Sequence, residues 1–188
     1  ERVMNEWNRA VQYQRQFMSE YRFQTKEQII TWILGHAQAE RDQNGSVLGY
    51  VGTITDITDR KMKEAALAES RNLLETIIDT APMRIFWKDR NLRYLGCNSV
   101  FAKDAGAKSV QDMIGTDDYQ WGWKSQADRY RNDDHLVIDS GIPKQSYEEP
   151  QTTPNGRMSW LRTSKIPLRN GHNEIIGVLG IYQDITKQ

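Results

Sequence analysis

Few residues of this chain have the types and spacing that covalent or metal chemistry requires. The three histidines, His36, His135 and His172, are far apart in the sequence, and no His-Glu-x-x-His motif joins two of them. The one cysteine, Cys97, forms neither an intrachain disulfide nor a zinc site of paired cysteines. No motif pairs a nucleophile with a general base. We therefore predict a chain that is not an enzyme, with no catalytic residue and no metal site.

One short motif, Asp-Ile-Thr, occurs twice and marks an internal repeat. Residues 32–58 and 160–186, which each end in this motif, match without a gap at a constant offset of 128 residues. The identical pairs are Trp32/Trp160, Arg41/Arg169, Gly49/Gly177, Gly52/Gly180, Asp56/Asp184, Ile57/Ile185 and Thr58/Thr186. A match of this length predicts two copies of one structural unit.

The two copies differ in length. The second has a long stretch ahead of its matching segment, beginning near Met83, and the counterpart of that stretch would begin about 45 residues before Glu1. We therefore predict three parts. Residues 1–58 are the carboxyl-terminal half of a first domain, residues 59–80 are a helical linker, and residues 81–188 are a complete second domain.

Hydrophobic periodicity and turn residues predict the elements that position these motifs. In the first unit they predict a helix at 2–14 and strands at 16–25, 29–40 and 47–57. In the second they predict strands at 83–88 and 93–97, helices at 99–105, 110–115 and 124–140, and strands at 145–152, 158–168 and 175–185. The second unit is therefore expected to be α+β, with an antiparallel sheet and helices on one face.

The linker at 59–80 contains neither Gly nor Pro and is rich in good helix formers. Leu67, Leu74 and Ala81 recur every seven residues, with Ile77 and Ile78 near the intermediate position. Two interpretations stay open: a surface helix packed on one domain, or a coiled-coil connector between the chains of a homodimer.

The composition argues against several classes of function. Lys and Arg number 25, as do Asp and Glu, so no general positive field attracts nucleic acid or an anionic membrane. No apolar run approaches the roughly 20 residues of a membrane span, and no signal sequence opens the chain. With a single cysteine, the chain is expected in a reducing, cytoplasmic setting.

The second unit resembles a PAS sensory domain over residues 83–186. The resemblance rests on the segments Phe86-Trp87-Lys88-Asp89-Arg90, Tyr94-Leu95-Gly96-Cys97-Asn98, Trp160–Arg169 and, above all, Gly177–Thr186. Residues 2–58 are similar to the last helix and last three strands of another such domain. The resemblance implies a five-stranded sheet of order 2-1-5-4-3 and a small pocket between sheet and helices.

In flavin-binding relatives the residue two before the closing Asp faces the ligand, and here that residue is Tyr182. Strand alternation and helix periodicity extend the expected pocket to neighbouring elements. Its expected lining is Phe101, Met113, Tyr130, Ile138, Gln151, Leu161, Thr163 and Tyr182. A packed core without a ligand is the alternative, although Gln151 and Tyr182 would need polar partners if buried.

The resemblance leaves the cofactor unknown. Flavin or another small molecule is compatible with the fold, but the Asn-rich pattern of flavin-binding relatives is absent. Haem-binding relatives take an axial histidine from the long helix, and His135 does not stand at their position, which argues against haem. Trp121 and Trp123 are expected in the core, over the pocket or at a partner surface.

The resemblance implies a sensory input module of a signal-transduction protein. Ligand binding would shift the sheet, and Asp56 and Thr58, like Asp184 and Thr186, would pass the shift to a following helix. In the family such tandem modules precede histidine kinase or cyclic-di-GMP enzyme domains, and no motif of either occurs here. The alternative is a ligand-free module for dimerisation and spacing.

Overall fold

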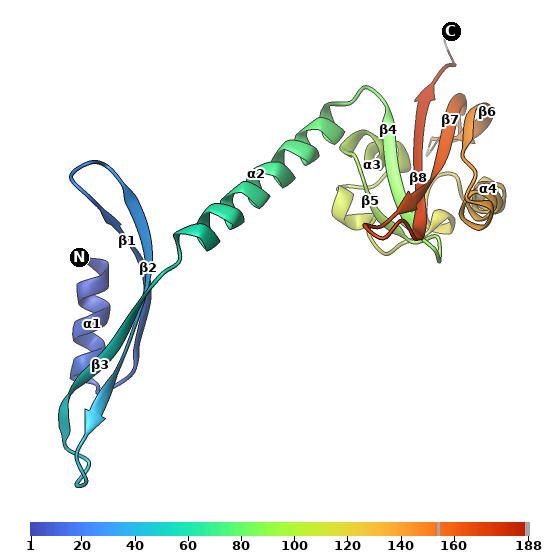
Figure 1. The fold of residues 1–188 in the computed structure, drawn as a ribbon. Coiled ribbons are helices and arrows are strands. Elements are labelled where there is room, and N and C mark those ends of the chain that lie inside the picture. The colour runs from blue at the N-terminus through green and yellow to red at the C-terminus, as the bar shows by residue number, and fades with distance from the viewer. Residues whose placement is uncertain (154, 187–188) are drawn as a thin grey trace. The chain divides into compact units, whose positions relative to one another are not determined.

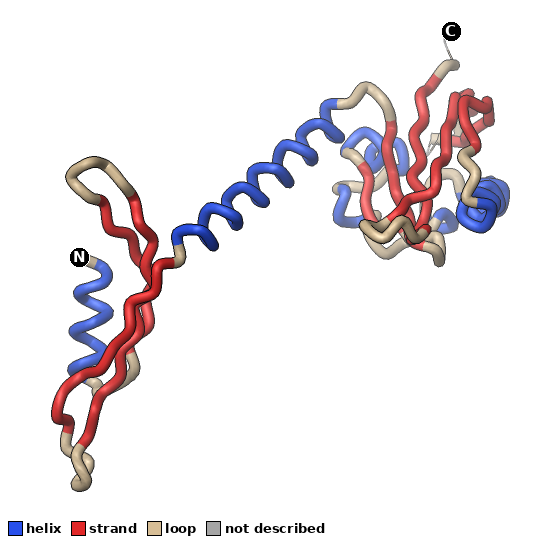
Figure 2. The backbone as a smooth tube through the Cα atoms, in the orientation of Figure 1, coloured by secondary structure: helices blue, strands red, loops and turns tan. Residues whose placement is uncertain are grey.

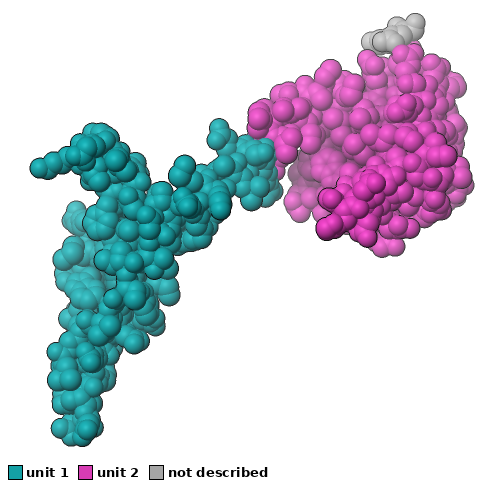
Figure 3. All heavy atoms as spheres, in the orientation of Figure 1, with its two compact units in different colours: residues 1–72 teal, residues 73–188 magenta. Residues whose placement is uncertain are grey.

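The computed structural model describes residues 1–153 and 155–186 of the chain. The chain divides into two compact units, Glu1–Asn72 and Leu73–Gln188, which are coloured separately in Figure 3. Helix α2 (Thr58–Thr80) begins in the first unit and ends in the second.

The first unit is one helix on a three-stranded antiparallel sheet. Helix α1 (Arg2–Gln12) is followed by β1 (Phe17–Gln24), β2 (Ile30–Arg41) and β3 (Val47–Asp56), which pair in that order (Figure 1). Ala10 of α1 meets Phe17 and Ala37 of the sheet in a small buried cluster, with Trp7 packed against it. These bounds lie within two residues of those predicted from the sequence.

Helix α2 has no buried residue along its 23 residues. Leu67 is 73% exposed, Leu74 57% and Ile77 55%. The helix therefore forms from its own propensity and presents large apolar side chains to the surface. Clustered exposed apolar side chains of this kind are typical of a surface that meets a partner.

The second unit is an α+β domain. In chain order it contains β4 (Arg84–Asp89), β5 (Tyr94–Cys97), α3 (Ser99–Ala105), 3-10 helices at Val110–Asp112, Asp118–Gln120 and Lys124–Gln126, α4 (Ala127–Ser140), β6 (Lys144–Thr152), β7 (Met158–Arg169) and β8 (Ile175–Asp184). Its antiparallel strand order, β5-β4-β8-β7-β6, confirms the order 2-1-5-4-3 implied by the resemblance. Helix α3 packs on β4, and α4 packs on β7 and β8 (Figure 2).

Local signals account for most of the helix bounds. The Asn98 side chain caps α3 by accepting from the Phe101 N–H, and Gly141 ends α4 with a φ of +67°. The predicted helix from Lys124 is an α-helix only from Ala127, after a 3-10 turn. The turn at 118–120 was not predicted, although the Asp117 side chain caps it.

Two glycines of β8 let β4 approach closely. A side chain at Gly180 would overlap the Phe86 ring, and one at Gly177 would overlap the backbone carbonyl of Lys88. Strand glycines are often found where another backbone or side chain comes this near. The central strand pair of the sheet thus depends on the absence of two side chains.

Replacing Gly180 with alanine therefore destabilises the second unit. The added methyl group forces the Phe86 ring out of the core, and overpacking of this kind costs about 1–3 kcal/mol. Urea denaturation of Gly180→Ala and of the turn variant Gly171→Ala measures the effect, since nothing lies within 4 Å of a Cβ at Gly171. Equal midpoints for the two variants would show that the Phe86 contact does not constrain the sheet.

Candidate ligand-binding site and signal junctions

A small cavity lies in the core of the second unit. Its volume is about 30 Å³, which is room for one or two water molecules. Aromatic rings form part of its wall: Phe86, Tyr94, Phe101, Trp123, Tyr130 and Tyr182. Polar and charged side chains form most of the rest: Lys88, Asp118, Glu149, Gln151, Thr163 and Lys165, beside Leu161. The core therefore encloses a space in which polar groups meet aromatic faces.

Six of the eight residues expected to line a pocket do line this cavity. They are Phe101, Tyr130, Gln151, Leu161, Thr163 and Tyr182. Met113 is fully buried in the same cluster but is not part of the cavity wall. Ile138 packs instead against Leu92 and Val178 in a second cluster, because it stands two helical turns beyond Tyr130 on α4.

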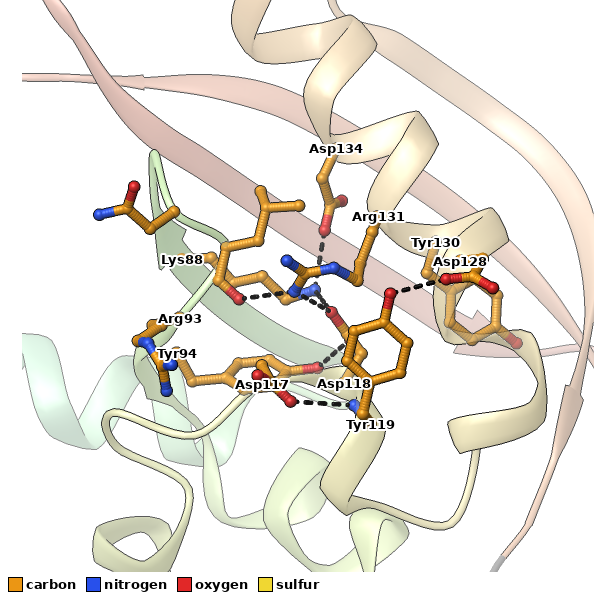
Figure 4. A network of polar contacts seen from close by, with 12 residues as sticks. Lys88, Arg93, Tyr94, Asp117, Asp118, Tyr119, Asp128, Tyr130, Arg131 and Asp134 are labelled. Carbon is orange, nitrogen blue, oxygen red and sulfur yellow. Dashed lines mark hydrogen bonds and ion pairs between the residues drawn. The ribbon is translucent and has the colours of Figure 1, made fainter.

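Two lysines and two aspartates are buried together at the cavity, and Figure 4 shows part of their network. The Lys88 Nζ lies 2.6 Å from a carboxylate oxygen of Asp118 and 2.7 Å from one of Asp134. The Lys165 Nζ lies 2.6 Å from the other oxygen of Asp134 and donates to the backbone carbonyl of Tyr130 at 2.8 Å. The four charged side chains are at most 2% exposed.

These opposite charges keep one another ionised. Burial alone would lower the pKa of Lys88, but the carboxylates of Asp134 and Asp118 raise it above its ordinary value. Burial would raise the pKa of Asp134, and Lys88 and Lys165 instead hold it below its ordinary value. The Tyr94 hydroxyl donates to Asp118 at 2.7 Å, while burial raises the pKa of this phenol well above its usual range.

Sequence reasoning did not place either lysine in the site. The signal was present, because strand alternation puts Lys88 on the face of Phe86 and Lys165 on the face of Thr163. Buried lysines are rare unless they are paired, and periodicity does not identify the partners. Here a partner lies 46 residues from Lys88 in the chain, at Asp134.

Glu149 of β6 is the charged group of the cavity wall that forms no ion pair among the described residues. It is 3% exposed, and its Oε2 has no hydrogen-bond partner in the described part of the chain. Thr163 lies near enough to Glu149 to favour the charged form of the Glu149 carboxyl group. The Thr163 Oγ1 likewise has no hydrogen-bond partner among the described residues. Burial raises the pKa of Glu149, and Lys165 offsets this only in part.

The cavity in this form accommodates neither flavin nor haem. Sites for small molecules enclose roughly 300–1,000 Å³, against about 30 Å³ here. His135 is exposed on α4 and is not placed to ligate a haem in the core. Cys97 is buried, and burial raises the pKa of its thiol to about 11, so the thiolate is scarce at neutral pH.

The second Asp-Ile-Thr motif forms a hydrogen-bonded junction at the end of β8. The Trp160 backbone N–H donates to the Thr186 Oγ1 at 3.0 Å, and the Ile185 N–H donates to the Trp160 carbonyl at 2.8 Å. The Thr186 N–H donates to the Asp184 carboxylate at 2.9 Å. The motif thereby ties the last residues of β8 to the start of β7.

The first motif repeats these three hydrogen bonds at the end of β3. Trp32 donates from its backbone N–H to the Thr58 Oγ1 at 2.9 Å, and Thr58 donates to the Asp56 carboxylate at 2.8 Å. The Ile57 N–H donates to the Trp32 carbonyl at 2.8 Å. Helix α2 starts directly at Thr58, so this junction lies at the first turn of the helix.

Both units match family models. Residues 78–188, more than half of the chain, match a model described as a PAS fold, and residues 1–54 match a second model with the same description. The chain belongs to the PAS fold family. PAS domains are sensory, non-catalytic modules of signal-transduction proteins, and this chain is of that type.

The PAS relatives include proteins much longer than this chain. It is 32% identical over 120 residues to the methanogenesis regulatory histidine kinase FilI of Methanothrix harundinacea, covering 64% of this chain and 13% of that protein. The Vibrio cholerae VqmA–ligand–DNA complex is similar with a TM-score of 0.56 at 23% identity, covering 60% of this chain and 50% of VqmA. A PAS domain from Colwellia psychrerythraea has a TM-score of 0.52 at 17% identity, covering 65% of this chain and 99% of that one. Because VqmA and the Colwellia domain are each less than 25% identical to this chain, their similarity shows the fold alone.

Every helix among the described residues is too short or too polar to cross a lipid bilayer. No three His, Cys, Asp or Glu side chains in residues 1–153 and 155–186 are grouped so that they could hold a metal ion.

Replacing Asp134 with asparagine destabilises the second unit. The substitution leaves Lys165 buried without a carboxylate, and breaking a buried pair in this way costs about 3–5 kcal/mol. Asp139→Asn, an exposed change on the same helix, is the matched control, with an expected effect below about 0.5 kcal/mol. Denaturant unfolding at pH 7 measures both, and similar stabilities would contradict the role of the network.

The stabilisation from Asp134 depends on pH. Because its pKa is held below the ordinary 3.8, the folded state binds fewer protons than the unfolded state around that pH. The contribution is therefore fully present above about pH 3.8 and is lost as the pH falls through the lower, folded-state pKa. Stability curves from pH 2 to 7 should be flatter for Asp134→Asn than for the parent chain.

Proposed function

We propose that the second unit is the sensing domain of this chain. It binds a small ligand in the cavity beside Glu149 and relays the bound state through β8 to an effector domain of the same polypeptide. One observation carries the proposal: the Glu149 Oε2 and the Thr163 Oγ1 are buried at the cavity without hydrogen-bond partners among the described residues. Acceptors of this kind in a native core call for a water molecule or a ligand.

The charges of the wall favour a neutral ligand that donates hydrogen bonds. Lys88 and Lys165 are neutralised by Asp118 and Asp134, so neither is free to attract an anion. Glu149 repels an anion and accepts from an N–H or O–H group. The aromatic rings of the wall add a preference for a planar molecule, which stacks or meets them edge-on.

A ligand larger than two water molecules requires the cavity to open. Trp123 is 2% exposed and packs on Phe101, with 5.3 Å between ring centroids. It lies between two short 3-10 helices, at 118–120 and 124–126, and not on a strand or long helix. Connecting segments yield more easily than sheet strands, so we expect Trp123 to move aside on binding.

The relay starts at Tyr182. This residue lines the cavity and stands two positions before Asp184 on β8. Its hydroxyl donates to Asp104 of α3 at 3.3 Å, and Asp104 is also 2.8 Å from Arg84 of β4. A ligand that displaces Tyr182 therefore pulls on β8, and the junction at Thr186 passes the change to whatever follows.

The effector we propose is a histidine kinase or a cyclic-di-GMP enzyme in a cytoplasmic signalling protein. The similarity to FilI, named as a histidine kinase, supports the first choice. The neutral charge balance favours no contact with nucleic acid. The absence of nucleic-acid contact stays a prediction. The similar protein VqmA is described in a complex with DNA.

We interpret the chain as three parts. The first, residues 1–58, is the carboxyl-terminal half of a first PAS domain; the second, residues 59–80, is the linker; the third, residues 81–188, is the complete second domain.

We propose that the linker helix α2 holds two chains together as a homodimer. Leu67, Leu74 and Ile77 are more than half exposed and share one face of the helix, as a coiled-coil seam does.

The second candidate function is a ligand-free module for dimerisation and spacing. The small volume of the cavity, about 30 Å³, favours this reading, because the core then needs only ordered water to satisfy Glu149.

The ligand proposal predicts a preference among small probes. In an NMR fragment screen, 2-pyridone should shift signals of Thr163 and Gln151, whereas N-methyl-2-pyridone, which lacks the donor, and benzoate, which is anionic, should not. Glu149→Gln should weaken the response to 2-pyridone at least about tenfold, because it removes the charged acceptor. Glu148→Gln, the exposed neighbour on β6, should leave it unchanged. Benzoate binding in the cavity would contradict the predicted preference for a neutral donor, and no response to any probe would favour the spacer.

The dimer proposal predicts a change of mass on substitution in α2. Leu74→Asp places an unpaired charge in the seam, and we expect the dimer dissociation constant to rise by about 100-fold or more. Ala65→Asp adds the same charge on the opposite face of α2 and should leave the dimer intact. Light scattering across a concentration series measures both, and a monomeric parent chain would refute the proposal.

A further inference from the structure

A groove lies at the surface of the second unit, apart from the core cavity. Its volume is about 660 Å³, within the roughly 300–1,000 Å³ that sites for small molecules enclose. Three segments form its walls: the end of α3, the turn between β6 and β7, and the end of β8. None of the residues that line it also lines the core cavity. We call it the junction groove, because Asp184 and Thr186 of the second Asp-Ile-Thr junction are part of its wall.

The two carboxylates of the junction groove already have partners. Asp104 accepts from the Arg84 Nε at 2.8 Å and from the Tyr182 hydroxyl at 3.3 Å. Asp184 accepts from the Thr186 backbone N–H at 2.9 Å and from the Thr186 hydroxyl at 2.5 Å. The charge of Asp104 is therefore balanced by Arg84, whereas Asp184 is held by hydrogen bonds alone.

Two cations of the junction groove have no such partner. Lys103 stands in the last turn of α3, and Arg157 lies at the turn between β6 and β7. Among the described residues, no ion pair or hydrogen bond engages the Lys103 ammonium group or the Arg157 guanidinium group. Because Arg84 neutralises Asp104, these two cations face only Asp184, and the groove has an excess of positive charge.

The turn that carries Arg157 is closed by its own hydrogen bonds. The Thr153 backbone N–H donates to the Arg157 carbonyl at 2.8 Å, and the Arg157 N–H donates to the Thr153 Oγ1 at 3.1 Å. The Thr153 hydroxyl donates to the side-chain oxygen of Asn155 at 2.5 Å, so the amide nitrogen of Asn155 remains as a further donor. The turn thus presents a guanidinium group and an amide group to the groove.

The fold of the turn does not require the charge of Arg157. At the offset of 128 residues, Thr153 corresponds to Thr25 and Arg157 to Ile29. The first unit closes its turn in the same way: the Thr25 N–H donates to the Ile29 carbonyl at 2.9 Å, and the Ile29 N–H donates to the Thr25 Oγ1 at 3.3 Å. An apolar residue therefore serves the same turn, and the guanidinium group is a feature that the second unit adds to it.

We propose that the junction groove is a second binding site and that it holds a phosphate monoester of a small organic molecule. The three terminal oxygens of a phosphate can accept from Lys103, Arg157 and Asn155 together, and hydrogen bonds between ionised groups are the strong ones. The negative charge of the phosphate meets the excess positive charge of the groove. Met158, which lines the groove and is 60% exposed, offers apolar contact to the organic part.

A ligand in the junction groove lies directly against the end of β8. Asp184 and Thr186 line the groove, and Thr186 also accepts from the backbone N–H of Trp160 on β7. Asp104, in the same wall, accepts from Tyr182 of β8. The ligand therefore contacts the junction without entering the core, and the groove can be occupied whether or not the core cavity binds a molecule.

NMR titration with phenyl phosphate tests the proposal. At pH 7.5 this monoester should shift the signals of Thr153 and Thr186, and methyl phenyl phosphate, a diester with a single negative charge, should bind more weakly. Arg157→Gln and Lys103→Gln should each weaken binding of phenyl phosphate at least about fivefold, because each removes a charged donor. Lys108→Gln, which changes an exposed lysine outside the groove, is the matched control and should leave the affinity unchanged.

Four results would overturn the proposal. The absence of any response to phenyl phosphate would leave the groove without this ligand. Equal weakening by Lys108→Gln would reduce the effect to a general attraction between charges. Equally tight binding of terephthalate would replace the phosphate with a dicarboxylate. Loss of the response in Glu149→Gln would place phenyl phosphate in the core cavity.

Discussion

The ion cluster of Lys88, Lys165, Asp118 and Asp134 is the constraint on which the second unit depends. Taking four charges out of water carries a large desolvation cost, and only close pairing offsets it. The pairing therefore fixes how far apart β4, β7, α4 and the turn at 118–120 can lie. An apolar core of equal volume would be more tolerant of small displacements, because dispersion contacts have no fixed partner.

The selectivity that we propose for the cavity also follows from this constraint. Each lysine is already satisfied by a carboxylate, so the positive charges contribute structure and not an anion site. Glu149 is left over, with its raised pKa and its unpaired Oε2. The chemistry available to a ligand is therefore decided by the one charge that the network does not neutralise.

The sequence predicted the elements of both units well, because Asn98, Gly141 and the paired turn residues are local signals that act within a few positions. It predicted the cavity only in part. Ile138 was placed in the lining since it shares a helix face with Tyr130, yet which stretch of that face meets the cavity depends on how α4 crosses the sheet. The partners of Lys88 lie 30 and 46 residues away, and no periodicity in a single sequence connects residues at such distances.

The two copies of the repeat share the junction at the end of the last strand but not the buried charges of the cavity. The Asp-Ile-Thr junction is the same in both units, down to three hydrogen bonds. The cavity chemistry is not repeated: at the offset of 128, Lys165 corresponds to Ala37 and Thr163 to Gly35. Asp134 corresponds to Glu6, whose partly exposed side chain bonds to Arg2 instead of to a buried lysine. The hydrogen-bonded strand ends are thus retained in both units, while the buried charges on which the proposed ligand selectivity rests occur, among the described residues, in the second unit.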